Sequence, residues 1–178
     1  ALSFLRQAAA TTFRSFWGQF GWMGVLMDSR IYLALGILSG IALVGCLWAL
    51  WTLLHSEERA AYRQPLGFLL AWLLLTVAAY VWYNLTFVQH QGRYLFPALP
   101  AWGLCFALGM DQALRARTSR WLAVGWLVLA AAAVGVGLLR GRLHKWLIAL
   151  SGGTGIALGV NALLNGRLRR LSLFLIYV

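Results

Sequence analysis

The feature that most constrains this chain is a series of long stretches without a charged residue or a histidine. Four of them contain 24, 26, 19 and 21 residues and lie between Arg30 and His55, Arg63 and His90, Arg120 and Arg140, and Lys145 and Arg167. About 20 apolar residues, rising ~1.5 Å each along an α-helix, cross the ~30 Å hydrocarbon core of a bilayer. Each stretch is therefore long enough to form a transmembrane helix.

A fifth stretch is shorter, because only 17 residues separate Arg93 from Asp111. Asp111 precedes Arg115 by four residues, the spacing at which an acid and a base pair on a helix, so this helix can continue to about Leu114. We therefore predict an all-α polytopic integral membrane protein with about five transmembrane helices. The spans are expected near 31–54, 66–87, 95–114, 121–139 and 146–165.

The composition agrees with a membrane protein. Hydrophobic residues make up 62% of the chain and charged residues 11%, whereas soluble domains have roughly 45–50% and about 25%. The net charge of +11 comes almost entirely from arginine, and Lys145 is the one lysine. These bases flank the apolar stretches, which favours contact with lipid phosphates over nucleic-acid binding. We expect membrane lipids as partners and no nucleic acid.

Residues 1–30 have a different pattern. Between Thr12 and Met27, apolar residues recur at three- and four-residue steps, as in an amphipathic helix: Phe13, Phe16, Trp17, Phe20, Met23 and Met27. Three glycines, at positions 18, 21 and 24, weaken this helix by roughly 1 kcal/mol each. We therefore predict an interfacial helix that forms against lipid or neighbouring helices.

The loops differ in basic content, which predicts an orientation. Loops 55–65 and 111–120 and the end after Asn165 carry eight bases: Arg59, Arg63, Arg115, Arg117, Arg120, Arg167, Arg169 and Arg170. The opposite loops carry four, Arg93, Arg140, Arg142 and Lys145, and the N-terminal segment adds Arg6, Arg14 and Arg30. The positive-inside rule places the first group in the cytoplasm and loops 88–96 and 140–145 outside. The apolar tail 171–178 indicates that a further span begins there and that the chain belongs to a longer multipass protein.

Neither the histidines nor the cysteines of this sequence predict a metal or cofactor site. His55, His90 and His144 lie at span ends, where a histidine is usually hydrated, whereas a haem or pigment ligand lies within a helix bundle. Cys46 and Cys105 lie inside apolar stretches without the spacing of a metal site or a disulfide framework, and we expect them to be small core residues.

Glycine spacing predicts close helix packing. The pairs Gly36/Gly40 and Gly155/Gly159 have the small-xxx-small spacing that lets transmembrane backbones approach, and we favour packing within the chain over a dimer face. The glycine-rich run 151–159 lacks the lysine of a phosphate-binding loop.

The most informative segment runs from Gln89 to Pro100. It combines an arginine at the membrane surface, Arg93, with an adjacent aromatic residue, Tyr94, and two prolines that open the next helix. From the residues alone, an arginine that extends its charge to the lipid headgroups and a specific phosphate site are equally good interpretations. Arg93 and Tyr94 are the candidate lipid-phosphate-binding residues.

Two segments resemble known sequences. Gly92–Ala101, GRYLFPALPA, resembles the Arg-Tyr-Leu-x-Pro-x-x-Pro pattern near the C-terminal spans of polytopic glycosyltransferases that use polyprenyl-phosphate sugars. Phe13–Val25 resembles a segment that precedes those spans in a related bacterial multipass family. The resemblance implies sugar transfer from a lipid-phosphate donor at the outer face of the bacterial inner membrane. By this resemblance, Arg93 is expected to contact the lipid phosphate.

The chain departs from this family in its acidic residues. The family places its catalytic acid in the first outer loop, near the N-terminus, and the four acids here are Asp28, Glu57, Glu58 and Asp111. Of these, only Asp28 lies on the predicted outer side, so we predict no catalytic residue. Our first hypothesis is the membrane-embedded C-terminal part of a glycosyltransferase-like protein that helps bind polyprenyl phosphate. The alternative is a non-catalytic accessory or structural subunit of a larger respiratory or photosynthetic membrane complex.

Overall fold

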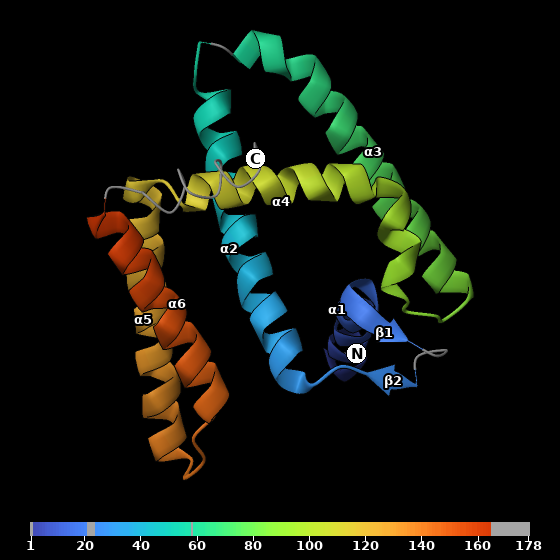
Figure 1. Cartoon of the computed structure of the whole chain (residues 1–178). Helices are drawn as coiled ribbons and strands as arrows, with labels where there is room; N and C mark the ends of the chain where they lie inside the picture. The colour runs from blue at the N-terminus through green and yellow to red at the C-terminus, as the bar shows by residue number, and fades with distance from the viewer. Residues whose placement is uncertain (1, 21–23, 58, 165–178) are drawn as a thin grey trace. The chain divides into compact units, whose positions relative to one another are not determined.

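The computed structural model describes residues 2–20, 24–57 and 59–164, and within them the fold is helical (Figure 1). The described elements are α1 (Leu2–Gly18), β1 (Gln19–Phe20), β2 (Val25–Leu26), α2 (Ser29–Leu54), α3 (Arg59–Thr86), the 3-10 helix η1 (Gly92–Ala98), α4 (Leu99–Ala113), α5 (Ala116–Leu139) and α6 (Lys145–Leu163). The predicted helical class is confirmed. The apolar tail 171–178 and the arginines at 167, 169 and 170 lie outside the described residues.

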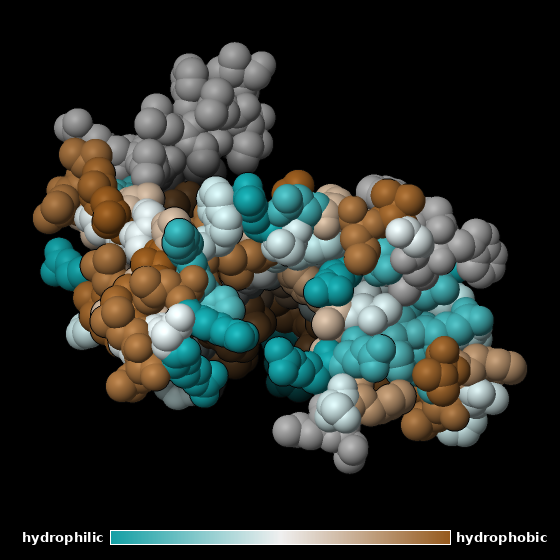
Figure 2. All heavy atoms as spheres, turned by 90° about the horizontal axis from the view of Figure 1, so that it is seen from below, coloured by the Kyte–Doolittle hydropathy of each residue, from teal (hydrophilic) through white to brown (hydrophobic). Residues whose placement is uncertain are grey.

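Four helices in the described part of the chain are long and apolar enough to cross a membrane: α2, α3, α5 and α6. They coincide with four of the predicted spans, although α3 begins at Arg59, seven residues before the predicted start. Many of their large apolar side chains are exposed, among them Leu75, Trp82 and Leu139. Figure 2 shows exposed brown, hydrophobic areas on the face of the molecule that it presents. This exposure, with helix length, gives the chain the character of a multipass membrane protein.

The region predicted as a fifth span is divided into two elements. η1 covers Gly92–Ala98, and α4 covers only 15 residues, which extend about 22 Å as an α-helix. Pro97 lies inside η1 and Pro100 in the first turn of α4. A single α-helix over 95–114 would need the N–H that Pro100 lacks, whereas a helix that begins at Leu99 does not. Arg115 pairs with Asp111 at 3.3 Å as expected. A fifth membrane crossing remains a prediction.

The N-terminal segment differs from the predicted helix over 12–27. The helix α1 ends at Gly18, and β1 then pairs antiparallel with β2. The prediction is correct for the first part and wrong for the second, because glycine at the helix end favours a change of backbone direction. The Tyr32 hydroxyl donates to the Gly18 carbonyl at 2.6 Å and so satisfies an end group of α1. The interfacial position of this segment remains a prediction.

The chain divides into two compact units, residues 1–35 with 53–104 and residues 36–52 with 105–178. In the second unit, α5 and α6 form the most extensive helix pair. A Cβ atom at Gly155 would lie 2.8 Å from Leu127 Cγ, and one at Gly159 would lie 3.8 Å from Ala123 Cβ. The predicted close packing is therefore confirmed at Gly155, whereas Gly159 makes only an ordinary contact. At the first pair, Gly40 makes only an ordinary contact with Trp126.

Polar side chains join the α4–α5 turn to α6 in this unit. Asn161 is fully buried and donates to the Leu114 carbonyl at 2.8 Å and to Ser119 Oγ at 3.1 Å. Ser119 in turn donates to the Leu158 carbonyl at 2.8 Å. Because Leu114 lies just beyond the end of α4, its carbonyl lacks a helical partner, and Asn161 satisfies it from α6.

Candidate lipid-phosphate site

The segment that carries Arg93 begins directly against α1, within the first unit. The Gly92 N–H donates to Ser15 Oγ at 2.6 Å. A Cβ atom at position 92 would overlap the Thr12 carbonyl oxygen and the Phe16 backbone nitrogen. Only glycine lets the two backbones approach this closely, so the start of η1 is fixed by a hydrogen bond and by backbone packing.

An aromatic cluster centred on Phe16 holds the other end of η1. The ring of Phe16 lies edge-on to Phe96 at 5.6 Å and to Trp102 at 6.5 Å between centroids, and to Trp17 at 5.6 Å. Edge-to-face pairs at such distances add roughly 0.5–1.5 kcal/mol to the burial of the rings. Both ends of η1 are therefore anchored on α1.

The last turns of α3 form the third contact of this site. Thr12 Oγ1 and the Tyr80 hydroxyl are 2.6 Å apart and share a hydrogen bond. The rings of Tyr83 and Tyr94 lie 5.0 Å apart, and the Tyr94 hydroxyl donates to Gln89 Oε1 at 3.1 Å. Residues from α1, α3 and η1 thus meet around the segment predicted to bind a lipid phosphate.

Arg93 is exposed between buried Gly92 and half-buried Tyr94. Its guanidinium carbon lies 5.6 Å from the centroid of the Tyr94 ring, within the range of a cation–π contact. A hydrogen bond with Tyr83, and secondly one with Arg93, lowers the pKa of the Tyr94 phenol from its ordinary value. Tyr94 therefore limits the movement of the arginine, and the guanidinium remains accessible to an anion.

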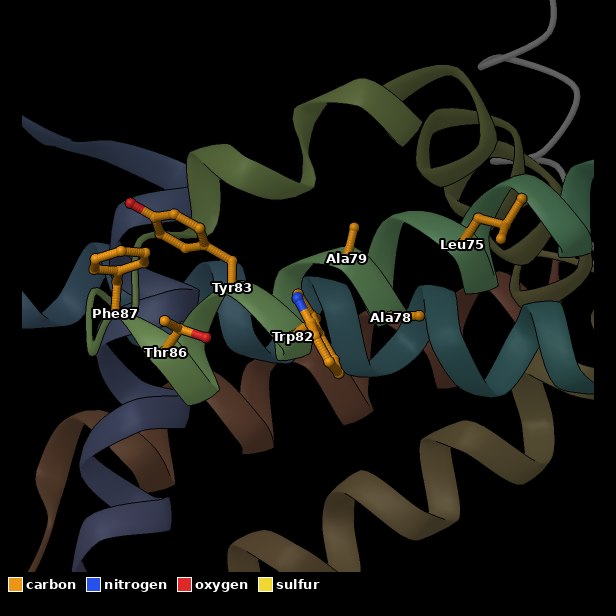
Figure 3. A pocket seen from close by; sticks show the side chains of 7 residues that line it. All are labelled: Leu75, Ala78, Ala79, Trp82, Tyr83, Thr86 and Phe87. Carbon is orange, nitrogen blue, oxygen red and sulfur yellow. The ribbon is translucent and has the colours of Figure 1, made fainter.

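A hollow of about 710 Å³ runs along one face of α3 (Figure 3). It is lined by Leu75, Ala78, Ala79, Trp82, Tyr83, Thr86 and Phe87. From the first to the last of these residues the helix rises about 18 Å. Figure 3 shows Leu75 at one end and the rings of Tyr83 and Phe87 together at the other. Tyr83 also contacts Tyr94, so the apolar hollow ends beside the residue that follows Arg93.

The sequence identified Arg93 and Tyr94 but not the residues that hold them. The hydrogen bond between Ser15 and Gly92 joins residues 77 positions apart, which helical periodicity cannot detect. The hollow on α3 does have a signal in the sequence. Ala78 and Ala79 precede Trp82 and Tyr83 by four residues, so small side chains lie next to large ones on one face of the helix.

The three histidines differ in their exposure. His55 and His144 are exposed as expected, whereas His90 is only partly exposed. Its Nε2 is buried without a hydrogen-bond partner among the described residues, and its ring lies 5.3 Å from Phe4, edge-on. Packing against α1 therefore buries part of the His90 ring, although this residue lies at a predicted span end.

In the part of the chain that the structure describes, acidic and metal-ligating side chains do not gather into a group of three or more. Asp28 accepts a hydrogen bond from the Arg30 N–H at 2.7 Å at the start of α2, where it caps the helix. Within residues 2–20, 24–57 and 59–164, no group of three or more His, Cys, Asp or Glu side chains is placed to hold a metal ion. Comparisons with protein-family models, curated proteins and solved structures find no match for this chain. The interpretation of the site therefore rests on its geometry.

Proposed function

We propose that this chain is the membrane-embedded C-terminal part of a glycosyltransferase-like multipass protein and that it binds a lipid-phosphate carrier. The observation that supports this function is the apolar hollow of α3, which ends beside the segment that presents Arg93. A polyprenyl phosphate has the same two parts, an apolar chain and a terminal anion. In this proposal the chain lies in the bacterial inner membrane with Arg93 facing outward.

The two parts of the site suit the two parts of the lipid. Each methylene removed from water contributes about 0.8 kcal/mol, although in a bilayer the gain is smaller because lipid tails also surround the chain. The hollow therefore supplies shape selectivity more than affinity. The guanidinium group supplies the affinity, because its planar fork of donors matches phosphate oxygens.

The proposed role is binding and not transfer. The acid on the predicted outer side, Asp28, is engaged with Arg30 at the start of α2, and it lies outside the motif that resembles the glycosyltransferases. Catalysis in this proposal belongs to a part of the protein that precedes the given sequence. The 178 residues alone are expected to bind polyprenyl-phosphate sugars without turning them over.

Lipid binding to Arg93 variants tests the proposal. We expect native mass spectrometry of the purified chain with polyprenyl phosphate to show binding weakened about tenfold or more by Arg93→Ala. Arg93→Lys keeps the charge but loses the fork, so it should also weaken binding. Arg142→Ala, which removes an exposed arginine from the α5–α6 turn, is the matched control. Full binding by the Lys variant would reduce Arg93 to an interfacial anchor.

A second function is favoured by one observation on α3. Only 6% of the residues in its most apolar stretch are buried, against 28% for α2 and α6, so most of this helix is available for contact with lipid or with another protein. A non-catalytic subunit of a larger membrane complex would use such a face. The intact mass of the natural polypeptide separates the two functions: a longer chain with an acidic outer loop supports the transferase, and a short chain in a constant set of subunits supports the accessory role.

A further inference from the structure

Two helices of the second unit come unusually close at a pair of glycines. A Cβ atom at Gly45 in α2 would overlap the carbonyl group of Gly109 in α4, and one at Gly109 would overlap the carbonyl of Ala42. Helices with ordinary side chains pack with their axes 8–10 Å apart, and glycine removes the atoms that maintain this distance. The backbones of α2 and α4 are therefore in direct contact.

The two cysteines of the chain lie at this crossing. Cys46 follows Gly45 and is four residues after Ala42, whereas Cys105 is four residues before Gly109. Residues four apart share a helix face, so the face of each helix that makes the glycine contact also carries a thiol. The two thiols are close neighbours across this crossing. Cys46 is buried, and Cys105 is partly exposed.

We propose that Cys46 and Cys105 form an oxidisable thiol pair, which a lipid-soluble quinone converts to a disulfide. A disulfide requires Cα atoms about 4.4–6.8 Å apart, and the backbone contact at Gly45 and Gly109 brings α2 and α4 close enough for thiol contact. Two neighbouring thiols on different helices can react with each other.

The reaction balances with one quinone. The partly exposed Cys105 adds to the quinone first, and the sulfur of Cys46 then attacks that of Cys105 and displaces the reduced ring. Two S–H bonds break and one S–S bond forms. Both electrons and both protons leave on the quinone, which becomes a hydroquinone.

The surroundings of the two thiols determine which class of oxidant can reach them. Cys46 lies within α2, a helix long and apolar enough to span a membrane, and the residues around both cysteines are apolar. Charged and water-soluble oxidants are excluded from such surroundings. A quinone is apolar, dissolves in the hydrocarbon core and accepts two electrons.

Oxidation of the chain in lipid nanodiscs tests the pair. A short-chain ubiquinone analogue and, separately, the thiol oxidant diamide are added, and free thiols are then blocked with an alkylating reagent. We expect an intact mass about 2 Da lower with neither thiol alkylated, one hydroquinone per disulfide, and a cross-linked peptide that contains both cysteines. Neither Cys46→Ser nor Cys105→Ser should form the intramolecular disulfide. Cys105→Ser should leave Cys46 alkylatable, and Cys46→Ser should leave Cys105 either alkylatable or carrying the quinone.

A displaced thiol is the geometric control. Cys105→Ser combined with Ala107→Cys moves the thiol about 200° around α4, to an exposed position, and this variant should not form the intramolecular bond. Absence of a disulfide with both oxidants overturns the pairing. A disulfide with diamide alone overturns the quinone as oxidant, and equal cross-linking in the displaced variant overturns the role of the α2–α4 contact.

Discussion

The α5–α6 pair and the η1 segment are held by opposite means. Between α5 and α6, small residues such as Gly155 and Ala123 let two long helices lie together along their length. η1 is short and instead depends on particular anchors, the hydrogen bond from Gly92 to Ser15 and the ring cluster around Phe16. Small-residue packing produces an extended scaffold, whereas separate anchors hold a segment that still exposes Arg93. This division suits a protein whose binding residue must remain accessible.

Overpacking of the α5–α6 pair is expected to produce the largest effect. In Gly155→Leu the Cβ atom of the new side chain would lie less than 3 Å from Leu127. The helices must therefore separate, which lowers the free energy of unfolding by about 1–3 kcal/mol or more. Gly153→Leu is the matched control, because a Cβ there would meet no described atom within 4 Å. Thermal unfolding in detergent measures both variants. Equal stabilities would show that small-residue packing does not hold this pair.

Loss of the buried amide of α6 should have an intermediate effect. Asn161→Leu removes the hydrogen bonds to Leu114 and Ser119 and leaves the Leu114 carbonyl without its donor, which costs about 1–2 kcal/mol in a membrane setting. Ser119→Ala retains the bond to Leu114 and should cost less. If the serine variant unfolds at the lower temperature, the amide is not the main connection between the α4–α5 turn and α6.

Removal of the anchor of η1 should have the smallest effect on stability and a local one. Ser15→Ala deletes the acceptor of the Gly92 N–H, which costs about 0.5–1.5 kcal/mol and speeds hydrogen exchange at that amide roughly 2- to 12-fold. Ser56→Ala loses only a local bond to Leu53 and is the control. Unchanged exchange at Gly92 would place the anchoring of η1 in the aromatic cluster alone.

The sequence predicts the long helices well because their cause is local. A charge-free stretch of about 20 residues has few alternatives to a membrane helix, and α2, α3, α5 and α6 follow it. The predicted span 95–114 fails to appear as one helix because two prolines outweigh its apolar character. The predicted helix over 12–27 continues past Gly18 because periodicity does not detect the β1–β2 pairing.

The candidate site was predictable only in part. Arg93 and Tyr94 stand out because a charged residue beside an aromatic one marks a span end. The proximity of Cys46 to Cys105, like the hydrogen bond between Ser15 and Gly92, involves residues of different helices. Such contacts depend on how helices cross, and residue spacing within one helix carries no information about the crossing.

The most direct measurement of the central claim is a comparison of polyprenyl phosphate with the uncharged polyprenol, by native mass spectrometry, on two variants. Ala79→Leu fills the apolar hollow of α3 and should weaken both lipids, while Val81→Leu, at an exposed position outside the lining, should weaken neither. Arg93→Ala should weaken polyprenyl phosphate about tenfold and leave polyprenol unchanged. Equal weakening of the two lipids by Arg93→Ala, or equal binding by Ala79→Leu and the wild type, would contradict a site that binds a lipid phosphate through α3 and Arg93.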